Sequence, residues 1–185
     1  MKKNLLNIGF SLVILFALTG CGDEGGESNE PAAQETGAGV DSRIEAVFTD
    51  MEIADAMAVT EVRTTAKPGE EVVVAGKIAG TMKPFAEGFA TLVLGDLELH
   101  TCDLNPDENC PTPWDACCEE PEVLKAMRLT VQIVDEENRP IGQGLKGVRG
   151  LKEMDEITVK GLVTEGSDNN NVIINVTALS QTVSS

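Results

Sequence analysis

EVVVAGKI, residues 71–78, is the stretch of sequence that decides the fold. Its three valines and its isoleucine are β-branched and favour a strand, and Pro68-Gly69 immediately before it is typical of a turn. Gly76 lies inside the stretch, where glycine often marks a bulge or the corner of a barrel. The sequence therefore predicts a strand that bends sharply.

Strand patterns continue on the C-terminal side of this stretch. In RLTVQIV, residues 128–134, Leu129, Val131 and Ile133 alternate with polar residues, which indicates a half-buried strand. Three further segments are rich in β-branched residues: 89–94, which 97–100 extends or follows, 156–163 and 172–179. GSDNNN, residues 166–171, separates the last two and has the composition of a hairpin turn.

Five short strands with a bent first strand and a long connection between the third and fourth resemble the OB-fold, a small Greek-key barrel. We therefore predict an all-β domain, an OB-fold-like five-stranded barrel with a short N-terminal helix and a Cys-rich loop insertion. An immunoglobulin-like sandwich is the alternative, and it is disfavoured because seven strands are hard to find. Thr49 and Glu52 match a capping box, so the helix is expected at about Asp50–Ala58, with an extension toward Thr64 also compatible.

The N-terminal segment predicts export. Lys2 and Lys3 precede an apolar run that is too short for a comfortable membrane span, as in a signal peptide. The run ends in LTGC, residues 18–21, which resembles the lipobox of bacterial lipoproteins. That resemblance implies an acylated Cys21 and a membrane partner reached through the lipid anchor. A secreted protein with a chance cysteine is the alternative.

Three parts of the chain follow from these patterns. Residues 1–20 are expected to be a lipoprotein signal peptide and residues 21–43 a disordered acidic tether, because the tether has hardly any large apolar side chain. Residues 44–181 are expected to form a single OB-like barrel domain with the Cys-rich insertion at 101–121. Gly rather than Asp follows Cys21, which resembles the pattern of outer-membrane lipoproteins, so we expect a cell-envelope location, lipid-anchored to the outer membrane and facing the periplasm.

Composition excludes some classes of function. The chain has 185 residues, 14 Lys and Arg against 31 Asp and Glu, and a formal net charge of −17. Nucleic acid is a poor partner for such a chain, since binding it depends on basic residues that neutralise phosphates. The one histidine, His100, has no recognisable nucleophile or paired carboxylate beside it in the sequence, so no catalytic residues are assigned and no enzyme is predicted.

The Cys-rich insertion is the most distinctive feature. Cys102, Cys110, Cys117 and Cys118 are an even set in a chain with an export signal, which favours two disulfides and therefore no cofactor. Bonding between the adjacent pair would be strained, so each is expected to reach back to one of the earlier two, in an order left open. The alternatives are a zinc or copper site with His100 as an extra ligand, and redox-active thiols, although no Cys-x-x-Cys pair is present.

Other patterns favour simpler interpretations. Alternating oxygen donors from Asp103 to Asn109 are similar to a calcium loop but lack its glycine and its final glutamate. The glycines at 142, 144 and 147 match a dinucleotide fingerprint only in spacing, because the expected strand and helix do not flank them. The basic residues Lys146, Arg149 and Lys152 are typical of a solvated face.

The lipobox, the tether, the barrel pattern and TCDLNPDENCPTPWDACCEEP, residues 101–121, together resemble lipoproteins of planctomycete-type bacteria, and this resemblance implies no particular activity. We therefore predict a non-enzymatic envelope lipoprotein whose OB-like domain binds a protein, a glycan or a small ligand. The alternative is a metal-binding or thiol-redox lipoprotein that uses the Cys-rich loop.

Overall fold

The computed structural model describes residues 39–104 and 110–182. The predicted signal peptide, Cys21 and all but the end of the predicted tether lie outside the described residues, as does the middle of the cysteine insertion, residues 105–109. The described residues belong to one compact unit, Ala38–Ser185.

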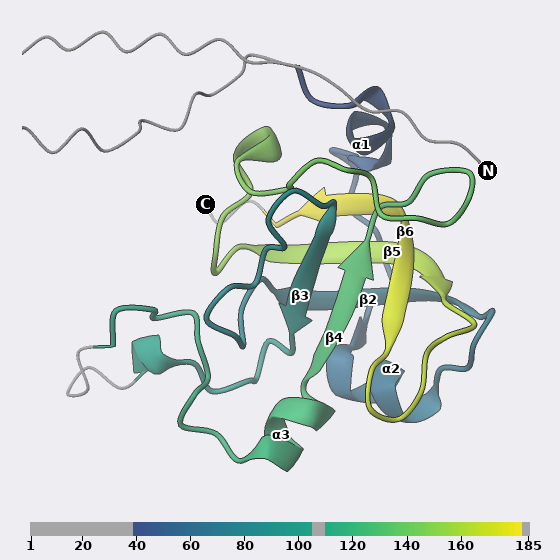
Figure 1. The fold of residues 1–185 in the computed structure, drawn as a ribbon. Coiled ribbons are helices and arrows are strands. Elements are labelled where there is room, and N and C mark those ends of the chain that lie inside the picture. The colour runs from purple at the N-terminus through teal and green to yellow at the C-terminus, as the bar shows by residue number, and fades with distance from the viewer. Residues whose placement is uncertain (1–38, 105–109, 183–185) are drawn as a thin grey trace, which may run out of the picture. The chain divides into compact units, whose positions relative to one another are not determined.

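The predicted barrel is confirmed. Five strands form a closed ring in the order β2-β3-β4-β6-β5, and β5 pairs with β2 to complete it (Figure 1). Every pairing in the ring is antiparallel except the parallel pairing of β4 with β6, and the two-residue strand β1 adds to the outside, parallel to β2. The strands are β1 (Met57–Ala58), β2 (Glu71–Lys77), β3 (Thr91–Gly95), β4 (Arg128–Gln132), β5 (Glu156–Val163) and β6 (Ile173–Gln181).

Buried and more exposed residues alternate along the strands of the ring, so that the buried side chains lie on the inner face of the barrel and the others on its outer face. In β4, Leu129 and Val131 are at most 2% exposed, whereas the residues between them are half-buried. Strands β2, β3, β5 and β6 contribute inward pairs in the same way, and all of these side chains belong to one hydrophobic core. Because a shift of one residue would turn these side chains outward, burial fixes the register of the ring.

Gly76 lies where β2 passes from one neighbour to the other. It pairs with Ile157 of β5, and the next residue, Lys77, pairs with both Glu156 of β5 and Gly95 of β3. A Cβ on Gly76 would lie 2.5 Å from the carbonyl oxygen of Gly95. Glycine is required here because two backbones approach closely at the corner of the barrel, which is the kind of position that the sequence predicted for Gly76.

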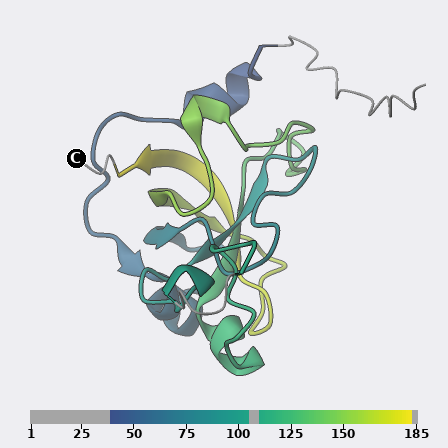
Figure 2. The same ribbon diagram turned by 90° about the vertical axis from the view of Figure 1, so that its left-hand side faces the viewer.

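The short N-terminal helix is confirmed, but its predicted position is wrong. Helix α1 is Ser42–Val47, which begins inside the predicted tether, and α2 is Val59–Thr65, whereas residues 49–56 are irregular. The Thr49 hydroxyl accepts a hydrogen bond from Met51 N, so the supposed capping residue makes a turn instead. Figures 1 and 2 place α1 above the barrel and α2 below it.

Both helices cover the core with few residues. Ile44 of α1 and Val59 and Val62 of α2 have no exposed surface. The N-terminus of α2 is capped by a distant residue, because Asp96 Oδ2 accepts hydrogen bonds from Thr60 N (2.9 Å) and Thr60 Oγ1 (3.0 Å). A third short helix, α3 (Pro121–Ala126), lies between the cysteine loop and β4.

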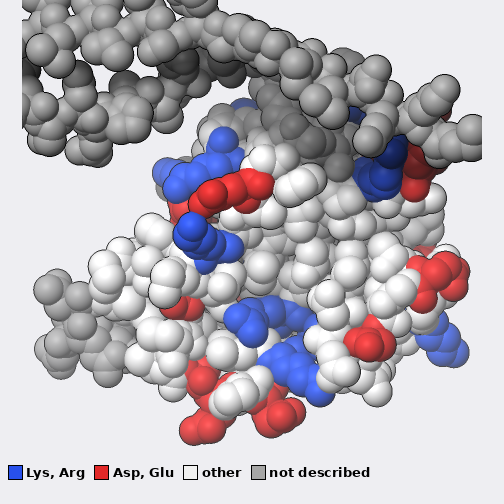
Figure 3. All heavy atoms as spheres, in the orientation of Figure 1, with Lys and Arg blue, Asp and Glu red and all other residues white. Residues whose placement is uncertain are grey.

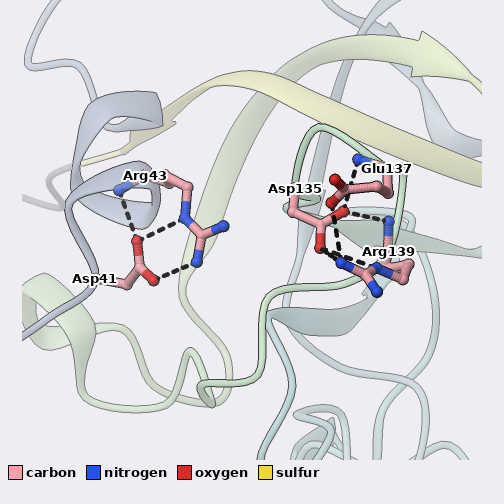
Figure 4. Close-up of polar contacts among 5 residues, drawn as sticks. All are labelled: Asp41, Arg43, Asp135, Glu137 and Arg139. Atoms are coloured by element: carbon pink, nitrogen blue, oxygen red, sulfur yellow. Dashed lines mark hydrogen bonds and ion pairs between the residues drawn. The ribbon is translucent and has the colours of Figure 1, made fainter.

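Acidic side chains at the surface are held by local contacts near α1 (Figure 4). Asp41 is the N-cap of α1 and pairs with Arg43 at 2.7 Å, while Arg139 pairs with Asp135 and Glu137, each at 2.9 Å. The hydrogen bonds from Arg43 lower the pKa of Asp41 from 3.8 to about 2. The charged form of Asp41 is therefore favoured by folding.

Asp41→Asn tests this contact, because asparagine keeps the capping oxygen and removes the charge. A depressed pKa stabilises the fold above the ordinary value and loses that contribution as pH falls through the folded value. We expect the melting temperature of the wild type to exceed that of Asp41→Asn at neutral pH, and the difference to vanish as pH falls from 3.8 to about 2. Paired melting curves across this range check it, and a difference independent of pH would contradict it.

Among the helices of the described residues, none has the length and apolar character required to span a membrane.

Candidate metal centre

The cysteine insertion follows β3 and forms a loop that projects beside α3 at the lower left of Figure 1. It contains a short 3-10 helix, Cys102–Leu104, and then returns toward its own start. Cys102 N donates to the carbonyl oxygen of Asp115 (2.8 Å), and Asp103 N donates to that of Pro113 (2.9 Å). This pairing brings the second half of the loop against Cys102.

Two contacts fix the loop to the barrel. Lys77 is 9% exposed, and its Nζ donates to the carbonyl oxygen of Leu99 (2.7 Å) and to Thr101 Oγ1 (3.3 Å). Trp114 joins the loop to the segment after β2: its carbonyl accepts from Gly80 N (2.8 Å) and its Nε1 donates to Met82 O (3.0 Å). The cysteine loop is thus held at both ends.

Three cysteine sulfurs meet inside this loop. Sγ of Cys102 lies 3.7 Å from Sγ of Cys117, which lies 3.9 Å from Sγ of Cys118, and all three lie within 4.8 Å of one another. A zinc ion with sulfur ligands at about 2.3 Å places those sulfurs about 3.8 Å apart in a regular tetrahedron. The two shortest separations therefore match the edge of such a tetrahedron. We call these three residues the sulfur group.

Cys110 lies next to the sulfur group. Its sulfur contacts the hydroxyl and carbonyl oxygens of Thr112 at 3.5 and 3.6 Å, and its thiol also interacts with that of Cys102. All four cysteines of the insertion are thus brought to one side of the loop. Cys102 is buried, Cys110 is half-buried, and the adjacent pair is exposed.

The thiols differ in acidity. Burial, followed by hydrogen bonding with Cys117 and Cys110, raises the pKa of Cys102 to about 12. Hydrogen bonding with the side chain and backbone of Thr112 lowers the pKa of Cys110 from its ordinary value. Cys102 is therefore protonated at neutral pH, which is not the state of an activated nucleophile.

His100, the predicted extra ligand, is directed elsewhere. Its Nδ1 lies 3.6 Å from Oε1 of Glu119, and its side chain is 53% exposed. Among the described residues, the ligand atoms that gather within 4.8 Å of one another come from the three cysteines alone. The imidazole lies near the loop without entering the sulfur group.

The predicted disulfides are not formed in the described residues. The separation of 3.7 Å between the sulfurs of Cys102 and Cys117 is a contact, since a disulfide bond is about 2.05 Å long. Their oxidation stays a prediction. The gathering of Cys117 and Cys118 in one group was not expected from the sequence, because adjacent cysteines rarely face the same ion.

The acidity difference leads to an expected order of alkylation. In reduced, metal-free protein at pH 8, iodoacetamide should modify Cys110 well before Cys102, because the thiolate reacts and Cys102 is 5% exposed with a pKa of about 12. Peptide mapping by mass spectrometry at successive times measures both rates. Equal rates in folded protein would contradict the arrangement, and urea-unfolded protein, in which both thiols are exposed, is the control.

The other sequence motifs fall outside this site. Of the calcium-like pattern, Asp103 is described, and its carboxylate accepts a hydrogen bond from Thr101 (2.6 Å); the later members lie outside the described residues. The glycines of 142–147 lie in an irregular loop that leads into a 3-10 helix, Val148–Gly150, which confirms the loop interpretation.

The fold and the sulfur group together define a small closed β-barrel domain with a thiol cluster that could hold a metal ion. Comparison with protein-family models and with curated proteins gives no match for this chain.

Proposed function

We propose that this protein is a non-enzymatic envelope lipoprotein whose OB-like barrel binds a soft metal ion, zinc or copper(I), through Cys102, Cys117, Cys118 and Cys110. The observation that carries the proposal is the sulfur group, with three sulfur atoms within 4.8 Å of one another on a loop anchored to the barrel. Thiolates are the protein ligands that both ions prefer.

The surroundings of the sulfur group favour a bound cation over thiol catalysis. Asp103 and Asp115 belong to the paired segments of the loop, and the charge of Asp115 acts against ionisation of Cys110. A reactive cysteine needs a neighbouring positive charge that stabilises its thiolate. The charge that acts on Cys110 is the negative charge of Asp115, and a metal ion would supply positive charge at the thiols.

The location belongs to the same proposal. The lipobox around Cys21 supports a lipid anchor, and the acidic tether supports a barrel held at some distance from the membrane surface. The membrane is then one partner, and an envelope protein, a glycan or a small ligand is a second. The net charge of −17 argues against nucleic acid.

A disulfide-stapled binding loop is the second candidate. It is favoured by the contact of 3.7 Å between Cys102 and Cys117, which a small movement converts into a bond in an oxidising compartment. In that case the loop serves the barrel as a rigid contact surface and no metal is held.

Metal analysis combined with a thiol count separates the two candidates. The native protein is purified from the cell envelope without chelator, its zinc and copper are measured by mass spectrometry, and its thiols are titrated in denaturant after the metal is removed. One ion per chain with four reduced thiols supports the metal site. Two disulfides per chain, with no zinc or copper retained after reduction and reloading, would overturn it.

The anchor has its own test. Mass spectrometry of the mature N-terminus should show an acylated Cys21, and Cys21→Ser should release the protein from the membrane fraction. An unmodified N-terminus that retains Met1 would overturn the proposed location while leaving the metal analysis intact.

A further inference from the structure

A second candidate site lies on the barrel beside α3. An open cavity of about 220 Å³ is lined by residues of α2, α3, β3 and β4, the segment after β2 and the connection between β5 and β6. Three basic side chains line it: Arg63 of α2, Lys125 of α3 and Arg128 of β4. A neighbouring hollow of about 380 Å³ shares Arg63 and Lys125. Figure 3 shows basic side chains gathered at the lower centre of this face, with acidic ones at the lower margin.

The two arginines are positioned by backbone oxygens and not by acids. Arg63 donates from Nη1 to the carbonyl of Arg128 (2.8 Å) and from Nη2 to that of Asn169 (2.9 Å). Arg128 donates from Nε to the carbonyl of Leu124 (3.0 Å) and from Nη1 to that of Gly80 (2.6 Å). These bonds fix both guanidinium groups in place and leave their charges without a partner carboxylate.

The basic residues of the cavity form no ion pair. Among the described residues, none of the eight ion pairs involves Arg63, Lys125 or Arg128, although the charge of Asp168 acts on Arg63 and Lys125 from a greater distance. The repulsion between Arg63 and Arg128 adds to the cost of burying Arg63. Two of the basic residues near the glycine-rich loop do form ion pairs, Lys146 with Glu153 and Arg149 with Asp50.

Two nitrogen atoms of the cavity have no acceptor among the described residues. No hydrogen bond of the described residues involves Nη2 of Arg128 or Nζ of Lys125. Thr81, Thr130, Asn170 and Asn171 add polar groups to the lining, and Val93, Leu124 and Leu129 supply its apolar part. Converging cationic donors with polar neighbours are what a tetrahedral oxyanion requires.

We propose that this cavity binds the phosphate group of a small phosphate ester, with Arg63, Lys125 and Arg128 as its cationic partners. The cavity is larger than a phosphate ion and leaves room for a small organic group beside it. The net charge of −17 excludes a long polyanion, because such a ligand would extend beyond the basic residues of the cavity and be repelled. A compact anion contacts those basic residues alone. The site lies outside the sulfur group and does not depend on a bound metal.

The test uses the mature chain and two probes, inorganic phosphate and glycerol 3-phosphate, followed by NMR shifts and calorimetry. Saturable binding of either probe is expected, with shifts at Lys125, Thr130 and Asn171. Tighter binding of glycerol 3-phosphate identifies an ester as the natural ligand, and equal binding identifies free phosphate. In Lys125→Glu the affinity should fall by at least about tenfold, because a charge-assisted hydrogen bond is lost.

Lys152→Glu is the matched control, because it makes the same change of net charge at an exposed lysine outside the cavity. It should retain most of the affinity. Lys125→Gln provides a milder variant in case charge reversal disturbs α3, and it should also bind more weakly. Absence of saturable binding of both probes to folded wild type, or an equal loss of affinity in Lys125→Glu and Lys152→Glu, would overturn the proposal.

Discussion

Cys117→Ser is expected to lower the affinity for zinc by more than about 100-fold, since even the outer-shell partners of metal ligands change affinity by about 10 to 100-fold. Cys117 is the central member of the sulfur group, at 3.7 Å from Cys102 and 3.9 Å from Cys118. Replacing Cys117 therefore removes one ligand. It also removes the sulfur that lies between those of Cys102 and Cys118. Competition with a chromophoric chelator measures the change.

His100→Ala is the control for this experiment. The imidazole faces Glu119 and is not among the ligand atoms of the sulfur group, so the variant should keep wild-type affinity. A loss of zinc in His100→Ala equal to that in Cys117→Ser would place the histidine in the site. If the wild type binds no zinc and Cys117→Ser only lowers the melting temperature, the loop is a disulfide staple instead.

Gly76→Ala is expected to destabilise the barrel by about 3 kcal/mol, a large effect for the addition of one methyl group. The new Cβ would lie 2.5 Å from the carbonyl oxygen of Gly95 and 2.7 Å from Cγ of Leu94. Backbone cannot move aside as a flexible side chain can, so β2 must separate from β3 where the ring turns. Reversible urea unfolding measures the loss.

Gly142→Ala is the matched control, since no atom lies within 4 Å of its added Cβ. Its stability should stay within about 0.5 kcal/mol of the wild type. If Gly76→Ala were equally well tolerated, the barrel corner would not depend on the absence of a side chain.

The barrel could be predicted from sequence because its determinants are local. Short patterns predict its strands: apolar residues alternate in β4, and β2 has a glycine after a run of valines. The parallel pairing of β4 with β6 left no such signal. Thr130 and Ile173 become partners through the path of the chain, and neither carries a residue type that identifies the other.

The helices were harder to place for a related reason. Residues 59–65 are rich in valine and threonine, which lose side-chain freedom in a helix, and the sequence predicted only that a helix at 50–58 could extend toward Thr64. The helix forms because Val59 and Val62 reach the core and because Asp96, 36 residues away from Thr60, caps its first turn. The segment at Thr49 has the residue types of a capping box, but the residues after it pack no apolar face against the barrel.

The candidate site was predicted only in part. The four cysteines could be identified from the sequence, but their spacing argued against a common ion. In the folded loop, the backbone hydrogen bond between Cys102 and Asp115 brings Cys102 close to Cys117 and Cys118 although they are far apart in the sequence. The cavity near Arg63 gave no sequence signal, because its three basic residues are separated in the chain and meet only when α2, α3 and β4 come together.

Strand β6 lies between β4 and β5 and pairs with both. Synthesis from the amino end leaves those two neighbours with bare backbone edges until residues 173–181 have emerged. Such edges are templates for association with other chains, so the nascent protein needs shielding during this interval. Termination before the last strand would yield an aggregation-prone open sheet, never a smaller barrel.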